Sequence, residues 1–188
     1  MTPSLSKRYA FLVFSIVILT ALILLSFGRV PFYENGPVAL WSSDVNSDQN
    51  SQQLADIYTF THLIHGLAFY FLLWAVFREK LSIGARLALA MGLECNWEII
   101  ENTDFVIQRY REATISLDYY GDSVLNSLGD ILACFIGFIA ARRFPIWVSV
   151  SFVILSELAL LFFIKDNLTL NIIMLLYPIE AIKMWQAG

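Results

Sequence analysis

Long apolar stretches recur along the chain, separated by shorter polar segments. The first, residues 9–27, contains no charged residue and directly follows Lys7 and Arg8. A helix that crosses a lipid bilayer needs about 20 mainly apolar residues, so this stretch predicts a membrane-spanning helix. It is longer than the core of a signal peptide, and residues 25–28 lack a small-x-small cleavage site. We therefore expect an uncleaved anchor.

Similar stretches predict one all-α integral membrane domain over residues 1–188, a bundle of about six spans. The spans are expected at residues 9–27, 58–77, 82–101, 124–141, 146–164 and 168–185. Tyr177, Pro178 and Glu180 interrupt the last one, which a re-entrant or interfacial helix would explain equally well. Residues 28–57, whose second half is rich in Ser, Asn, Gln and Asp, are expected to form a solvated outer loop.

The distribution of Lys and Arg predicts the orientation of these spans. If the N-terminus lies in the cytoplasm, eight basic residues fall on the cytoplasmic side and four on the opposite side. The eight are Lys7, Arg8, Arg78, Lys80, Arg86, Arg142, Arg143 and Lys183. Cytoplasmic loops of membrane proteins carry an excess of Lys and Arg, so we expect the N-terminus inside.

Composition agrees with a membrane protein and excludes other classes. Hydrophobic residues make up 58% of the chain and charged residues 15%, whereas soluble domains carry about 25% charged residues. A net charge of -4 argues against a nucleic-acid partner. Two cysteines far apart in sequence provide neither a disulfide framework nor a CxxC metal pair.

Polar residues inside the predicted spans gather at one depth. They are His62 and His65 in the second span, Glu94, Glu98 and Glu101 in the third, and Asp122, Asn126 and Asp130 at the start of the fourth. At 1.5 Å of rise per residue, all of them lie within roughly 15 Å of the outer interface. Spacings of three or four residues place each set on one helix face. Because an isolated charge in hydrocarbon is costly, the pattern predicts a shared, outward-facing polar cavity.

Two imidazoles and several carboxylates are the ligand set of zinc, manganese or non-haem iron. We expect metal ligands at His62, His65, Glu94, Asp122 and Asn126, and catalytic groups at Glu98, Glu101 and Asp130. A bound metal would activate water against an ester or phosphate, with Glu98 or Glu101 as base. The substrate would be a membrane lipid or lipid-linked molecule. The same groups would equally suit a hydrogen-bond network that packs helices together.

Two other functions fit the pattern. In a proton- or cation-coupled transporter, Asp130, Glu94, Glu157 and Glu180 would form a relay. The chain lacks the inverted repeat of such carriers, although a homo-oligomer could supply the symmetry. In a non-catalytic envelope assembly protein, the cavity would pack helices and loop 28–57 would bind a partner.

Several blocks of the sequence resemble a family of bacterial inner-membrane proteins of unknown function. They are residues 62–66, 94–102, 118–127, 130, 166–171 and 178–183. The resemblance implies a multi-pass protein of the bacterial cell inner membrane and implies no reaction. The motif layout is also loosely similar to that of other small membrane families, including the VanZ-like one, an analogy that transfers no function.

Overall fold

Eight α-helices and one short 3-10 helix form the part of the chain that the computed structural model describes, residues 7–114 and 116–188. The helices are α1 (Lys7–Ser26), α2 (Thr59–Phe77), α3 (Ile83–Glu101), α4 (Asp104–Ala113), α5 (Val124–Arg143), α6 (Ile146–Ile164), α7 (Leu168–Leu176) and α8 (Glu180–Ala187), with η1 (Arg78–Lys80) between α2 and α3. The described residues contain no named strand, so the prediction of an all-α fold is confirmed.

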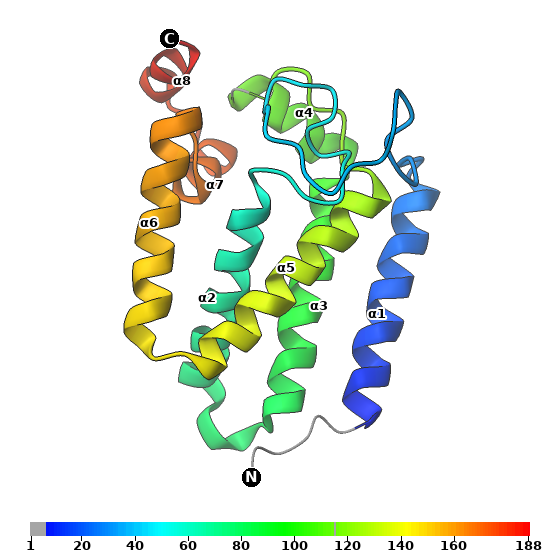
Figure 1. Ribbon diagram of the computed structural model, residues 1–188, viewed down its shortest axis with the longest axis vertical. Coiled ribbons are helices and arrows are strands. Elements are labelled where there is room, and N and C mark those ends of the chain that lie inside the picture. The colour runs from blue at the N-terminus through cyan, green and yellow to red at the C-terminus, as the bar shows by residue number, and fades with distance from the viewer. Residues whose placement is uncertain (1–6, 115) are drawn as a thin grey trace.

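Five long helices, α1, α2, α3, α5 and α6, run along the length of the molecule (Figure 1). The short helices α4, α7 and α8 gather at the end where α1 finishes, together with the loop that connects α1 to α2. We call this the loop end. Helix α1 begins at the opposite end, whereas α8 finishes at the loop end, so the start of α1 and the end of α8 are far apart.

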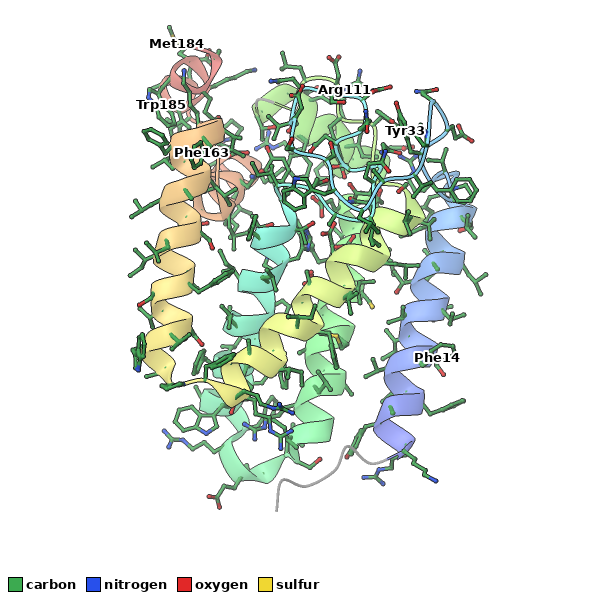
Figure 2. The ribbon with its side chains drawn as sticks, in the orientation of Figure 1. Phe14, Tyr33, Arg111, Phe163, Met184 and Trp185 are labelled. Atoms are coloured by element: carbon green, nitrogen blue, oxygen red, sulfur yellow. The ribbon has the colours of Figure 1, made fainter. Side chains whose placement is uncertain are left out.

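Within the described residues, four helices are long and apolar enough to cross a membrane: α1, α5, α6, and α2 together with η1. Helix α3 has a similar length but carries Arg86 and three glutamates. The outer helices α1 and α6 present bare apolar surface, as Phe14 and Phe163 show in Figure 2, with 63% and 75% of their surface exposed. Such surfaces are expected where lipid is the solvent, and they indicate a membrane protein.

The predicted sixth span, residues 168–185, is not a single helix, and in this respect the prediction is wrong. Tyr177 has an extended backbone, with φ -144° and ψ 92°, and separates α7 from α8. The break has a local cause, because Pro178 lacks an amide hydrogen and disfavours helical geometry in the residue before it. Helices of nine and eight residues are about 14 and 12 Å long, less than half the hydrocarbon thickness of about 30 Å.

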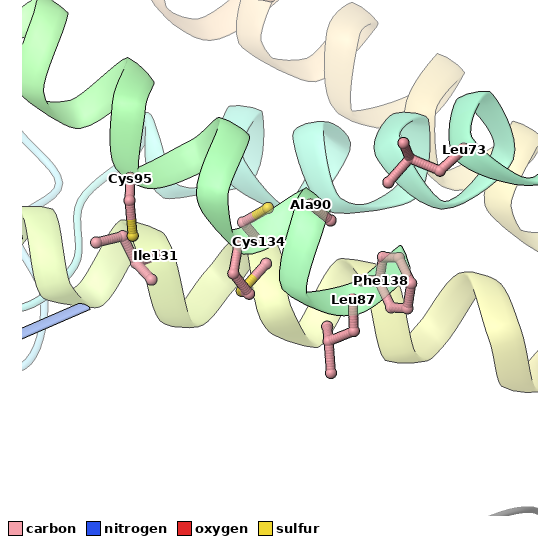
Figure 3. Packing of buried hydrophobic residues seen from close by; sticks show 8 residues of the cluster. Leu73, Leu87, Ala90, Cys95, Ile131, Cys134 and Phe138 are labelled. Atoms are coloured by element: carbon pink, nitrogen blue, oxygen red, sulfur yellow. The ribbon is translucent and has the colours of Figure 1, made fainter. Parts of the chain in front are cut away.

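Helices α2 and α5 approach each other almost to backbone contact. A Cβ atom on Gly66 would lie 2.0 Å from the carbonyl oxygen of Cys134, and one on Gly137 would lie 2.2 Å from that of Leu63. The apolar core is built around this crossing, with α3 packed against α5 (Figure 3). Its buried residues are Leu73, Leu87, Ala90, Met91, Cys95, Ile131, Cys134 and Phe138.

The loop between α1 and α2 is not solvated along its whole length, which corrects the prediction for residues 51–56. Gln52, Gln53 and Asp56 are 1%, 0% and 2% exposed. The loop folds down over the start of α5, where its backbone carbonyls accept hydrogen bonds from amides that a helix leaves unpaired. These bonds join Ser123 N to Ser51 O (2.9 Å), Val124 N to Val30 O (2.9 Å) and Leu125 N to Pro31 O (3.0 Å).

Candidate functional site

The polar ends of α2, α3 and α5 meet just below the loop end. Helix α2 runs away from this end, so His62 and His65 lie in its first two turns. Helix α3 runs toward it and carries its glutamates in the last three turns. Ser123 accepts a hydrogen bond from Asn126 N at 3.1 Å and so fixes the start of α5, which places Asp130 in its second turn.

His62 lies at the centre of this cluster and is surrounded by three carboxyl groups. Its Nδ1 atom lies 2.6 Å from Glu94 Oε1 and 3.4 Å from Glu98 Oε1. On the other side of the ring, Nε2 lies 3.8 Å from Asp130 Oδ2. All four side chains are buried. Acidic side chains therefore outnumber the imidazole in this cluster by three to one.

Glu94 joins the two histidines. His65 Nδ1 lies 3.0 Å from Glu94 Oε2 and 3.3 Å from Oε1, while His62 Nδ1 contacts Oε1. In a tetrahedral metal site with bonds of 2.0–2.2 Å, neighbouring ligand atoms are about 3.4 Å apart. The three side chains are therefore spaced closely enough to hold one metal ion, and their ligand atoms all lie within 4.8 Å of one another.

Two further groups of three residues have ligand atoms within the same distance. One is formed by His62, Glu98 and Asp130, and the other by Glu98, Glu101 and Asp122. Glu98 belongs to both groups. It is 0% exposed, and neither of its carboxylate oxygens makes a hydrogen bond within the described part of the chain. A buried carboxylate without partners is costly, so Glu98 is a carboxylate available to a ligand.

Asp122 is held by residues that sequence reasoning did not single out. Asn102 donates to Asp122 Oδ2 at 2.7 Å and accepts from the Asp122 amide at 2.7 Å, and Tyr119 donates to Oδ1 at 3.0 Å. Burial raises the pKa of Asp122 to about 6, against the hydrogen bonds from Asn102 and Tyr119, which lower it. The reciprocal pair would be hard to predict, because it links the end of α3 to the residues before α5.

Asn126, predicted as a metal ligand, has a side-chain amide that is used to hold the loop. Its Nδ2 atom donates to the carbonyl of Gln53 at 2.9 Å and lies 3.5 Å from Asp56 Oδ2. Asp56, which the sequence analysis missed, accepts hydrogen bonds from the amides of Ser51 and Tyr58, both at 2.8 Å. Its position just before a predicted span, where helix-capping residues occur, was the available signal.

A cavity of about 470 Å³ lies beside the cluster, between α2, α3, α5 and α7. Its lining includes acidic and imidazole side chains, those of His62, His65, Asp56, Glu101, Asp122 and Asp130. Apolar side chains also line it: Ala68, Phe69, Leu93, Trp97, Leu168, Ile172 and Leu175. Among the described residues that line the cavity there is no lysine or arginine.

Glu157 and Glu180 do not join this cluster. The carboxylate of Glu157 caps the start of α7, where it accepts hydrogen bonds from Leu168 N (3.0 Å) and from the amide and hydroxyl of Thr169 (3.1 and 2.6 Å). Glu180 is exposed at the start of α8. Neither lines the cavity, so the structure does not bring together the four carboxylates of the predicted relay.

Comparisons with known proteins agree over nearly the whole chain. Residues 24–188 match the family model described as a protein of unknown function, DUF2585. The chain is 52% identical over 175 residues to a UPF0314 protein of Paracoccus denitrificans, covering 93% of this chain and 90% of the relative. It is 49% identical over 174 residues to a UPF0314 protein of Sphingopyxis alaskensis, covering 93% and 92%.

A relative from Agrobacterium fabrum, also a UPF0314 protein, is 43% identical over 183 residues, which cover 97% of this chain and 92% of the relative. No solved structure matches the chain significantly. None of these matches bears on the looser similarity to VanZ-like proteins, which stays a prediction. The family match spans most of the sequence and the relatives are similar from end to end, so the chain belongs to the bacterial DUF2585 family.

Proposed function

We propose that the protein is a metal-dependent hydrolase or transferase of the bacterial inner membrane that acts on the headgroup of a lipid-like molecule. One observation carries this proposal: His62, His65 and Glu94 form a metal-sized cluster beside a cavity lined by both ionisable and apolar side chains. A purely structural polar network would need no such cavity next to it.

The proposed metal ion is held by His62, His65 and Glu94. Zinc, manganese and iron all bind imidazole and carboxylate ligands. When bound, such an ion lowers the pKa of a water ligand and polarises an ester or phosphoryl oxygen. Three protein ligands would leave a coordination position for water or substrate, as in catalytic metal sites.

Asp130 is the best-placed general base. It lines the cavity and lies next to the proposed ligand His62, whereas Glu98 does not line the cavity and Glu101, which does, belongs to a separate group of potential ligands. The hydroxyl of Thr59 donates to Asp130 Oδ1 at 3.0 Å, which leaves Oδ2 facing the His62 ring. In hydrolysis, Asp130 would take a proton from the attacking water and return it to the leaving oxygen as the bond to that oxygen breaks.

The apolar residues that line the cavity support an amphiphilic substrate. Leu93 and Trp97 from α3 face the same cavity as Leu168, Ile172 and other residues of α7. Ligand sites are mostly apolar, with a few polar groups that fix orientation. An acyl or polyprenyl chain packed against these apolar residues would place its headgroup beside the metal cluster.

The loop end is proposed to face the periplasm, with the N-terminus inside and five helices crossing the membrane. In this arrangement seven basic residues lie on the cytoplasmic side: Lys7, Arg8, Arg78, Lys80, Arg86, Arg142 and Arg143. The other five basic residues lie at the loop end. The excess follows the positive-inside rule, and it places the cavity within reach of lipids in the outer leaflet.

Elemental analysis of the detergent-purified protein tests the proposal. We expect at least one equivalent of zinc, manganese or iron in the wild type, and its loss in the double variant His62→Ala, His65→Ala. Glu112→Gln, which alters an exposed carboxylate on α4, is the matched control and should keep the metal. Asp130→Asn should keep the metal as well, yet lose turnover of lipid extract followed by mass spectrometry.

A well-folded wild type that takes up none of these metals during purification or after their addition would refute the metal role. The cluster would then be a packing network, as in the assembly-protein alternative. If Asp130→Asn turned over substrate as fast as the wild type, the metal site could stand but the assignment of the base would be wrong.

A further inference from the structure

The three groups of potential ligands are arranged so that two of them share no residue. His62, His65 and Glu94 form one, and Glu98, Glu101 and Asp122 form the other. The third group, His62, Glu98 and Asp130, takes one member from each. Ligands for one ion therefore leave a complete second set unused.

We propose that Glu98, Glu101 and Asp122 hold a second divalent cation beside the first. This inference rests on the proposed function, because the first cation is the one that His62, His65 and Glu94 would bind. An acidic cluster alone would not justify a site. The additional observation is Glu98, which is 0% exposed and has neither carboxylate oxygen hydrogen-bonded in the described chain.

Geometry explains why Glu98 makes no hydrogen bond. His62 Nδ1 lies 3.4 Å from Glu98 Oε1 but only 2.6 Å from Glu94 Oε1, and one ring nitrogen carries at most one hydrogen. Asp122 has the opposite character, since Asn102 and Tyr119 donate to its two oxygens. Such donors orient a ligating carboxylate, as second-layer partners do in metal sites, and a carboxylate oxygen retains a further lone pair for a cation.

Charge balance also favours a second cation. A divalent ion on His62, His65 and Glu94 more than offsets the charge of Glu94 but leaves four further acidic side chains nearby, those of Glu98, Glu101, Asp122 and Asp130. The cavity offers no lysine or arginine among its described lining residues to offset them. A second divalent ion would remove most of this repulsion.

The two positions differ in ligand chemistry. The first has two nitrogen ligands and suits zinc, iron or manganese, whereas the second has carboxylate oxygens and suits magnesium, manganese or calcium. Manganese is acceptable to both. Paired cations at one cavity would bind a phosphate ester headgroup, which the acidic lining would otherwise repel, and two-metal sites stabilise both the attacking and leaving oxygens of such esters.

Manganese binding to metal-free protein tests the second position. The wild type should bind two Mn²⁺ per chain, with the broadened paramagnetic resonance signal of a spin-coupled pair. The double variant Glu101→Gln, Asp122→Asn should bind one Mn²⁺ and give the signal of an isolated ion. The control double variant Glu112→Gln, Asp118→Asn carries the same chemical changes at exposed positions and should bind two.

The outcomes separate this inference from the proposed function. One Mn²⁺ per wild-type chain, lost in His62→Ala, His65→Ala and kept in Glu101→Gln, Asp122→Asn, would overturn the second position and leave the first intact. No Mn²⁺ in folded wild type would overturn both. The wild-type stoichiometry and signal decide the question even if the site variants do not fold.

Discussion

Single side chains at the loop end join segments that are far apart in the sequence. Asp166, which follows α6, accepts hydrogen bonds from Tyr58 before α2 (3.1 Å), Asn171 on α7 (2.9 Å) and Gln186 on α8 (3.2 Å). It is buried, and burial raises its pKa to about 6 despite these hydrogen bonds, which lower it. One carboxyl group thus fixes the C-terminal helices against the start of α2.

Asp166→Asn should make the stability of the protein less dependent on pH. Between about pH 4 and 6 the folded chain keeps a proton that the unfolded chain, with a pKa near 3.8, has released. Stability therefore falls as pH rises through this window, by up to about 3 kcal/mol at 1.36 kcal/mol for each pKa unit. In detergent, the melting temperature of the wild type should fall relative to that of the variant as the pH rises from 4 to 7. A difference between the two melting temperatures that stays constant over this range would contradict the assignment.

At this scale the sequence predicted part of the site. Histidine and glutamate positions followed from helical spacing, because residues three or four apart share a face. Asn102, Tyr119 and Asp56 did not, since each acts through a turn or loop whose course is set by tertiary contacts. Their partners, Asp122 and the amides of Ser51 and Tyr58, lie on other segments or in an irregular turn.

Among the helix contacts, the crossing of α2 and α5 leaves no room for larger side chains at its glycines. Glycine at positions 66 and 137 removes the Cβ atoms that would otherwise meet backbone carbonyls. Small residues at such crossings are typical of helix pairs in membranes, where close packing and hydrogen bonds replace the hydrophobic effect. His62 and Asp130 face each other across this same helix pair, so its geometry sets their distance.

Gly66→Ala should therefore destabilise the protein by about 1–3 kcal/mol or more, as overpacking does. The new Cβ would lie 2.0 Å from the Cys134 carbonyl oxygen, and backbone must move to accept it. Gly92→Ala on α3 is the matched control, because a Cβ there meets nothing within 4 Å. Its melting temperature should equal or exceed that of the wild type, since alanine favours a helix by about 1 kcal/mol over glycine.

Equal melting temperatures for the two alanine variants would show that α2 and α5 are not in near contact at Gly66.

The long helices were predictable from the sequence because the lengths of their apolar runs match the bilayer thickness. The division of residues 168–185 into α7 and α8 was not resolved from sequence. A proline flanked by apolar residues is compatible with a kinked span as well as with two short helices.

For the whole molecule, the direction of the helices fixes which ends share a side of the membrane. Five long helices alternate in direction, so the start of α1 and the end of α8 lie at opposite ends (Figure 1). Composition was enough to predict a membrane protein. Whether the number of crossings is odd or even depended on one segment, residues 168–185, which contains Pro178. With the N-terminus in the cytoplasm, this arrangement puts the C-terminus in the periplasm.

Reporter fusions at the C-terminus measure this directly. Alkaline phosphatase fused after Gly188 should be active and green fluorescent protein fused there should be dark, because each reporter works on one side of the inner membrane. Fusions that end after Lys80, between α2 and α3, should give the opposite pair of results. A fluorescent C-terminal fusion would restore an even number of crossings.

The hydrogen bonds between the α1–α2 loop and the start of α5 impose an order on biosynthesis. Val30, Pro31 and Ser51 leave the ribosome about 70 to 95 residues before their respective amide partners at Val124, Leu125 and Ser123. The loop is thus synthesised first and lacks these partners until α5 has been made. The cavity is consequently completed late in synthesis, and a nascent chain that stops before α5 leaves the loop without these hydrogen bonds.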